Sequence, residues 1–455
     1  MLRLDYPEIE ANQIPIVEGL LPPQLLKLPS DLEKVDQILN DEKFEEPFIE
    51  EFNVTIGRGS VPIRPYIRLM VLKYSNEWGY ETLEAKVNDS ITLKKFCRIP
   101  LDKKAPHSTT LIKLNKKYGE DIIKQLNKLL MEKLTERKII RGRKLRVDTT
   151  VVESNIKYPS DANLLKDCVD AVAGAVRKIR SVSNEATEGF RSGTRKTKKQ
   201  MLKIVKVLRR RNGNKKEEVR QIVDEMVQTA KDSEKAAKKV LNKVNEKDAS
   251  ENIKEVRQLE DILEVTREII KQTQEVQSGN MHIKDRIVSI HDRDARPIKK
   301  GKIRADVEFG YKVQIEECEK GFVSSYEVYN GNPNDDDLLM DAIERHKDTF
   351  GKVPDAATAD RGYGRKGNEE KLKDQGVKNV AIPVKGKKSR ERKEIENSRS
   401  FKRLKRWRAG IEARISLLKR KYGLDKSLSR GRNGTTAWVG WGILTHNLVN
   451  AVKYA

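Results

Sequence analysis

Three acidic residues lie where a carboxylate could take part in chemistry. Asp148 interrupts the apolar stretch L-R-V-D-T-T-V-V, Asp360 ends the stretch A-A-T-A-D, and Glu412 lies inside a segment rich in Lys and Arg. If the first two stretches are strands, their acids lie at the edge of a sheet, where α/β folds place their sites. Carboxylate oxygens are hard ligands that suit Mg²⁺ or Mn²⁺. Two such ions can support the in-line transfer of a phosphoryl group.

Each acid also has an ordinary structural explanation. An Asp at a strand end is often a turn former or a cap, and Glu412 could pair with Arg408 on a solvated helix face. A metal-binding site becomes the better explanation because all three acids occur together in this order of strands and helices. Other nearby acids could also bind a metal, and Glu308, inside a predicted strand, is the hardest of them to dismiss; the others are Glu153, Asp161, Asp292, Asp294 and Asp306.

The overall composition indicates a polyanionic partner. The chain has 455 residues, and its 93 Lys and Arg against 69 Asp and Glu give a net charge of +24. Basic side chains displace the counterions condensed on nucleic-acid phosphates, so DNA is the expected partner. The three scattered cysteines favour a reducing compartment over a disulfide framework. With no apolar signal segment or membrane-span length in view, we expect a soluble, cytoplasmic protein.

The elements that must position the acids follow a mixed order. Helical periods are expected near 31–39, 62–74, 80–88 and 107–135, then a strand or two in 143–156, and long helices in 161–278 with heptad-like apolar spacing. Strands are expected at 286–290, 307–315, 322–329, 356–360 and 379–384, helices near 335–349 and 367–375, and a basic linker at 385–405 before the final basic helix. The predicted fold class is therefore α/β, interrupted after its first strand by a long all-helical insertion and preceded by an all-α domain.

The helix that carries Glu412 is expected to have two separate rows. Its apolar row contains Leu404, Trp407, Ile411, Ile415, Leu418 and Tyr422. Lys405, Arg408 and Lys419 share a second row with Glu412, about a quarter turn away. This arrangement is expected if Glu412 holds a metal while the flanking cations bind phosphate.

These residues resemble the DDE transposases of bacterial insertion sequences. Arg408, Glu412 and Lys419 are similar to the family signature Y-x2-R-x3-E-x6-K, although Lys405 stands where the signature has Tyr. V-D-T-T-V-V-E-S-N-I-K-Y-P-S-D at 147–161 resembles the family's first aspartate motif, and T-A-D-R-G-Y at 358–363 its second. Residues 62–118 resemble the N-terminal helical domain of such enzymes, and blocks at 293–302 and 307–312 resemble later parts of the core.

The resemblance implies a ribonuclease-H-like core in which Asp148, Asp360 and Glu412 bind two Mg²⁺ ions, with Mn²⁺ as a substitute. It also implies cleavage of double-stranded DNA at the terminal inverted repeats of an element and joining of 3′-hydroxyls to target DNA in a bacterial cytoplasm. The domains are then 1–140, helical, for DNA-end binding or dimerisation; 141–160, the first part of the core; 161–279, the helical insertion; and 280–455, the remaining core. A homodimer is expected because two ends must be brought together. Arg408 and Lys419 carry over as DNA contacts, and Lys405 can still meet phosphate; the basic stretches add Arg191, Arg195, Lys196, Lys198, Lys199, Arg209, Arg210, Lys387 and Lys388.

Other functions remain open from the sequence. G-Y-G-R-K-G at 362–367 matches a dinucleotide-binding pattern, but the acid expected about 20 residues later is replaced by K-G-K-K-S-R. Its glycines are better explained by a tight turn beside Asp360. The same acidic site could belong to a nuclease without strand transfer. A DNA-binding protein without catalytic activity is a third hypothesis, and it predicts binding that depends on salt but not on divalent metal.

Overall fold

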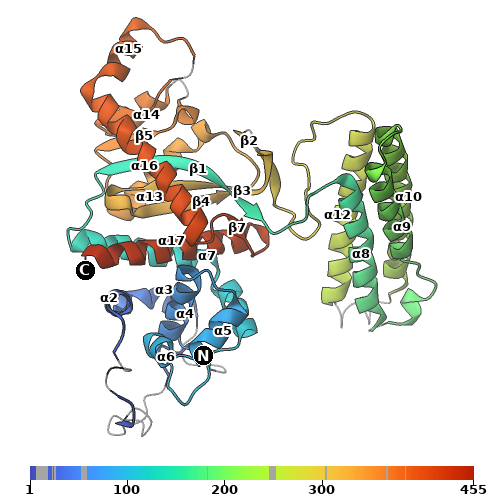
Figure 1. Ribbon diagram of the computed structural model, residues 1–455, viewed down its shortest axis with the longest axis horizontal. Coiled ribbons are helices and arrows are strands. Elements are labelled where there is room, and N and C mark those ends of the chain that lie inside the picture. The colour runs from blue at the N-terminus through green and yellow to red at the C-terminus, as the bar shows by residue number, and fades with distance from the viewer. Residues whose placement is uncertain are drawn as a thin grey trace. The chain divides into compact units, whose positions relative to one another are not determined.

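The computed structural model describes residues 1–6, 19–22, 24, 27–52, 59–181, 183–244, 253–302, 305–364, 367–384 and 386–454. These residues form two compact units. The first unit combines Met1–Glu153 with Tyr311–Ala455, and the second is Ser154–Gly310. Figure 1 labels the helices and strands of both units.

In the described part of the chain, the first unit begins with five short helices and one long helix. They are α2 (Ser30–Leu39), α3 (Glu46–Glu51), α4 (Ile63–Ser75), α5 (Tyr80–Asn88), α6 (Ile91–Phe96) and the long α7 (Ser108–Glu136), and α3 and α5 pack against α7. The helices predicted near 31–39, 62–74, 80–88 and 107–135 are therefore confirmed. α7 bends at Gly119, whose φ of 74° lies in the left-handed region that favours glycine.

The helix α17 (Gly431–Ala451) lies at the centre of this helical core. It packs against α7, α4 and β4 (Val323–Tyr329). Trp441 is 1% exposed, and its indole N–H donates to Asn115 Oδ1 at 2.9 Å. The apolar run 438–444 is thus explained by burial inside the protein. Across the described ranges, no helix is long and apolar enough to cross a membrane.

The sheet is mixed and supplies the α/β part of the fold. Besides β4, its strands are β1 (Lys144–Ser154), β2 (Arg296–Lys302), β3 (Ala305–Glu317), β5 (Ala356–Ala359), β6 (Asn379–Ala381) and β7 (Lys426–Ser427). Their order is β2-β3-β1-β5-β6, with β4 paired to β3 and β7 paired to β1. β3 and β4, at the two predicted strands 307–315 and 322–329, form an antiparallel pair, whereas β1, β5 and β6 run parallel. The α/β class and the helical N-terminal region are confirmed.

Helices alternate with the later strands. They are α13 (Leu339–Phe350), α14 (Asn368–Asp374), α15 (Arg390–Asn397) and α16 (Arg399–Lys421). α16 packs on β5 and β6, where Phe401 and Leu404 cluster with Ala356 and Ala381 (Figure 1). Leu404, Ile411, Leu418 and Tyr422 are buried and Trp407 and Ile415 are partly buried, so the predicted apolar row of this helix faces the protein interior.

The second unit is built mainly from four helices. They are α8 (Asp161–Arg180), α9 (Thr194–Arg209), α10 (Lys215–Lys243) and α12 (Ile253–Gln277), with α8 in contact with the other three (Figure 1). Val223, Met226 and Ala230 of α10 are buried, as are Leu259 and Leu263 of α12. The heptad-like apolar spacing seen in the sequence therefore forms the core between the helices.

Two predicted elements were wrong. Residues 286–290 form no strand, because the backbone of Ile287 pairs instead with the Gln272 side chain through bonds of 2.9 and 3.0 Å. Ile287 and Ile290 join the apolar core of the helices, which explains their β-like pattern. The predicted linker 385–405 contains α15 and the first turns of α16, which starts at Arg399. Side-chain caps from Ser389 and Ser398 open these two helices despite their high positive charge.

Candidate active site

The pairing of β1 with β5 brings two of the three acids together. The parallel register ends with Val147 opposite Ala359, and the next residues along the two strands are Asp148 and Asp360. Adjacent strands of a sheet lie about 4.8 Å apart. The two carboxylates therefore meet at one edge of the sheet, although 212 positions separate them in the sequence (360 minus 148).

The turn after β5 holds the Asp360 carboxylate in place. Asp360 caps the short helix Arg361–Tyr363 and accepts a hydrogen bond from the backbone N–H of Gly362. A side chain at Gly362 would collide with the carboxylates of Asp360 and Asp335. This close approach explains the first glycine of G-Y-G-R-K-G without a nucleotide; Arg365 and Lys366 of that motif lie outside the described residues.

Arg408 links the third acid to the first. Its Nη1 lies 3.8 Å from Asp148 Oδ2, and its Nη2 donates to Glu412 Oε1 at 2.8 Å. The side chains of Arg408 and Asp148 are 19% and 18% exposed, but that of Glu412 is 64% exposed. Glu412 is therefore the i, i+4 partner of Arg408, as one sequence interpretation expected, and it is linked to Asp148 through the Arg408 guanidinium.

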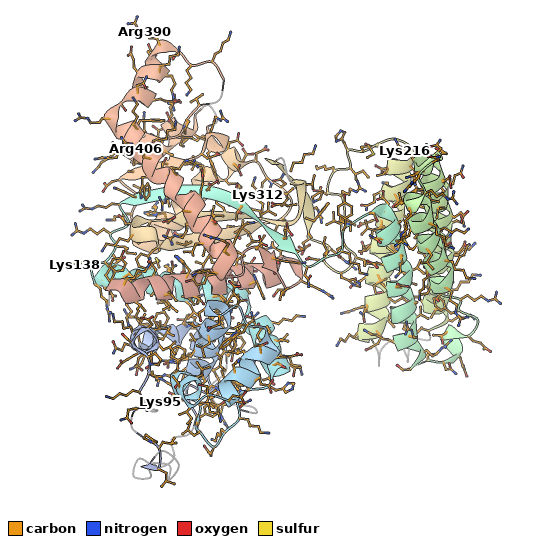
Figure 2. All side chains as sticks on the ribbon, in the orientation of Figure 1. Lys95, Lys138, Lys216, Lys312, Arg390 and Arg406 are labelled. Carbon is orange, nitrogen blue, oxygen red and sulfur yellow. The ribbon has the colours of Figure 1, made fainter. Side chains whose placement is uncertain are left out.

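A fourth carboxylate, Asp335, lies beside this group. Its Oδ1 accepts a hydrogen bond from Thr149 Oγ1 at 3.0 Å and pairs with Lys312 Nζ at 2.6 Å. Figure 2 labels Lys312. Asp335 belongs to the run D-D-D at residues 335–337, just before α13. Acidic residues are common at helix starts, so no sequence signal selected this one.

Burial gives Asp148 an unusual electrostatic environment. Burial raises its pKa to about 6. A hydrogen bond from the backbone N–H of Thr149, at 2.8 Å, and the charge of Arg408 act in the opposite direction. The charges of Asp360 and Asp335 raise the pKa further. Desolvation is the largest of these effects, and the two neighbouring carboxylates add to it.

A buried ionic network holds α16 against the strand that carries Asp148. Arg146, two residues before Asp148, pairs with Glu317 and also donates to the backbone carbonyl of Trp407. Arg414 of α16 lies 3.6 Å from the same Glu317, which is 0% exposed. Gly410 has no side chain to obstruct the Arg146 guanidinium. The network was missed in the sequence because Arg146 alternates with Leu145 and Val147 like an ordinary strand position, and Glu317 follows Glu316 at the end of an apolar strand.

Comparison with protein families gives two matches. Residues 284–448 match the model described as the transposase DDE domain, and residues 23–117 match the model described as a transposase domain, DUF772. The chain belongs to the DDE transposases. The first match contains Asp360 and Glu412, and the second covers most of the N-terminal helices. Neither the search of curated proteins nor that of solved structures gave a match.

The transposase family implies a ribonuclease-H-like core and DNA as the partner, as expected from the sequence. The family also typically uses divalent metals. The described residues contain no group of three or more His, Cys, Asp or Glu arranged to hold a metal ion as they stand. Asp148 and Asp360 nevertheless fit such an ion, because their adjacent hard oxygen atoms carry repulsion that a cation would relieve.

The basic residues predicted to contact DNA lie in two parts of the transposase. In the second unit, Arg195, Lys196, Lys198, Lys199 and Arg209 are exposed on α9, with Arg191 and Arg210 exposed at its two ends. Arg210 also pairs with Glu218 at 2.7 Å. In the first unit, Lys405 and Lys387 are exposed, whereas Lys388 pairs with Glu396 at 2.5 Å and Lys419 lies 3.8 Å from Asp425.

Two basic residues of the N-terminal helices are structural. Arg68 is 1% exposed and donates from Nε to Asp36 Oδ1 at 2.6 Å. Lys73 is 3% exposed, with its Nζ between 4.0 and 4.8 Å from the ring centres of Tyr74, Tyr80 and Trp438. Burial lowers the pKa of Lys73 to about 7. These side chains stabilise the helical core of the transposase and do not present charge to a ligand.

Proposed function

We propose that this transposase cuts DNA at the ends of its element and joins the resulting 3′-hydroxyls to target DNA. In this proposal Asp148, Asp360 and Glu412 hold two Mg²⁺ ions, for which Mn²⁺ substitutes. The observation that supports it best is the register of β1 and β5, which places Asp148 beside Asp360 at the sheet edge. Glu412 is connected to that edge through Arg408.

The chain's own groups have separate tasks in this reaction. Bound Mg²⁺ supplies positive charge that favours ionisation of the attacking hydroxyl and stabilises the leaving oxygen. Arg408 already lies between two carboxylates and can turn its planar guanidinium toward a phosphate. Lys419 and Lys405 lie on the same row of α16 and extend the positive surface along the DNA backbone. Lys405 replaces the tyrosine of the family signature, so a phosphate contact takes the place of an aromatic one.

The remaining parts are assigned by their charge and position in the chain. We assign 1–140 to DNA-end binding or dimerisation, 141–160 and 280–455 to the ribonuclease-H-like core, and 161–279 to a helical insertion. α9 carries seven Lys and Arg residues and no acid from Thr194 to Arg209, so its exposed cations are proposed contacts to DNA phosphates. Arg191, Arg210, Lys387 and Lys388 complete the proposed DNA-binding set. A homodimer is proposed because two element ends must be joined together.

A strand-transfer assay tests this function. The full-length protein is incubated with Mg²⁺, labelled DNA containing the sequences that flank its gene, and a plasmid target. The expected product is labelled DNA joined to plasmid, and EDTA abolishes it. Asp148→Asn, Asp360→Asn and Glu412→Gln are each expected to remove cleavage and joining while DNA binding persists.

Glu153→Gln is the matched control. Glu153 lies on β1, like Asp148, but it is exposed and an odd number of residues away, on the opposite face of the strand. The control variant should retain joining. Joined product from any of the three site variants would remove that residue from the site, and cleavage without joining in the wild type would indicate a nuclease.

A further inference from the structure

A second basic surface lies on α16, away from the carboxylates. Arg399, Arg403 and Arg406 are exposed and, together with Ser400, line an open hollow of about 480 Å³ in the first unit. Their spacing of four and three residues places the three guanidinium groups on one face of the helix. Figure 2 labels Arg406 on this helix. None of these arginines belongs to the signature row that contains Arg408 and Glu412.

Helix geometry separates this surface from the active site. Each residue of an α-helix turns by about 100°, so Glu412, nine residues after Arg403, lies about half a turn from it. Arg408, nine residues after Arg399, lies about half a turn from Arg399 by the same count. The apolar side chains of Phe401 and Leu404 pack against β5 and β6 and hold the helix in this orientation. A phosphate bound to Arg408 therefore cannot reach Arg399 or Arg403.

The positive charge of this surface has little local compensation. From Arg399 to Ile411, α16 contains six Lys and Arg residues and no acid. Two of the three acids on α15 already have partners: Glu394 pairs with Arg390, and Glu396 with Lys388 and Arg392. In the described part of the chain, no ion pair is recorded for Arg399, Arg403 or Arg406. Three guanidinium groups at such a surface suit a ligand with several phosphates.

We propose that Arg399, Arg403 and Arg406 bind the phosphate backbone of a DNA segment that does not include the phosphate being cleaved. Seven residues of helix span about 10 Å, over which one strand of B-DNA presents about three phosphates. The proposal rests on the proposed function only in taking DNA as the substrate. The segment can come from the element end, outside the cleavage point, or from target DNA, since both offer the same phosphate chemistry.

DNA-binding measurements in EDTA test this surface without requiring catalysis. The full-length wild type is compared with the triple variant Arg399→Gln, Arg403→Gln and Arg406→Gln, using a labelled 40-base-pair duplex of random sequence over a range of salt concentrations. Each lost phosphate contact lowers the slope of log K against log salt by about 0.9, so the triple variant should lose about 2.7. The affinity at 0.1 M salt should fall at least about tenfold.

The control variant carries the same change in charge elsewhere in the first unit. Lys128→Gln, Lys347→Gln and Lys352→Gln replace three exposed lysines that lie outside α16. Its salt slope should stay within about 0.5 of the wild type, because it removes no phosphate contact. Equal slopes for the two triple variants would overturn the proposal, since only a general effect of net charge would then remain.

A second duplex distinguishes the sources of the segment. It carries the DNA that flanks the gene in its element. If the triple variant has a lower salt slope than the wild type on both duplexes, the surface binds any DNA. A lower slope on the random duplex alone supports binding of target DNA. A lower slope on the flanking duplex alone supports binding of the element end. Unchanged slopes on both duplexes overturn the proposal. Absence of metal-dependent joining by the wild type would instead refute the proposed function and leave these binding results standing.

Discussion

Replacing Glu317 with Gln removes a negative charge that lies between two arginines in the interior of the first unit. The Glu317 carboxylate is 0% exposed and pairs with Arg146, whose side chain is 8% exposed, and with Arg414 at 3.6 Å. Removing one partner of a buried ion pair costs about 3–5 kcal/mol, because the other charge stays buried without compensation. We therefore expect Glu317→Gln to lower the free energy of unfolding by about 3 kcal/mol, the lower end of that range, because the amide retains a hydrogen bond.

Tryptophan fluorescence during urea unfolding measures this loss in the correct unit. The four tryptophans, Trp78, Trp407, Trp438 and Trp441, all belong to the first unit. The control is Glu394→Gln, which breaks the pair of Arg390 and Glu394, whose side chains are 94% and 68% exposed. An exposed pair is worth about 0–1 kcal/mol, so the control should unfold almost as the wild type does.

A double variant separates stability from positioning. Arg146→Met combined with Glu317→Leu replaces this buried pair by apolar groups, while Arg414, whose side chain is 19% exposed, keeps its hydrogen bond to His446 Nε2 at 2.7 Å. The double variant should therefore recover at least about 2 kcal/mol relative to the sum of the single variants. The hydrogen bond from Arg146 to the Trp407 carbonyl is still lost in the double variant. Its strand-transfer activity should therefore be lower than that of the wild type, although its folding is recovered. A loss below about 1 kcal/mol in Glu317→Gln, or full activity in the double variant, would refute the view that this network positions α16.

Two further predictions concern buried groups of the first unit. His346 is 0% exposed, and its Nε2–H donates to the Gly142 carbonyl at 3.0 Å. Burial lowers the pKa of His346 to about 4. Below pH 6.5 the unfolded state therefore binds more protons than the folded state, and the free energy of unfolding falls as the pH decreases. In urea unfolding, the free energy of unfolding of the wild type should fall by about 2 kcal/mol more than that of His346→Gln between pH 7 and pH 5. The control His282→Gln changes an exposed histidine and should keep the pH dependence of the wild type. An equal pH dependence of wild type and His346→Gln, or an altered one in the control, would contradict this cause. Asn447 is 0% exposed and bonds to Val323 through both the backbone N–H, at 3.0 Å, and the carbonyl, at 2.8 Å, so Asn447→Ala should lower the free energy of unfolding by about 2–4 kcal/mol. A thermal melt that matches the wild type would show that these bonds contribute little.

Local periodicity was enough to predict most elements of this protein. The helices α2, α4, α5 and α7 and the strands β1, β3 and β4 all lie close to their predicted positions, because their apolar residues recur at helix or strand spacing. The prediction failed where a side chain from elsewhere competed for the backbone. The Gln272 side-chain amide makes the hydrogen bonds to the Ile287 backbone that a neighbouring strand would otherwise make. No local sequence pattern predicts such a partner.

The sequence indicated the family and singled out the three acids and the helix of Glu412 as candidates, because these depend on residue types at fixed spacings along the chain. Their meeting required the tertiary structure: the register of β1 and β5 joins Asp148 to Asp360, and Arg408 joins Asp148 to Glu412. Asp335 and the network of Arg146, Glu317 and Arg414 came only from the fold. Contacts between residues far apart in the chain depend on strand order and helix packing, and single residues in a strand pattern do not encode them.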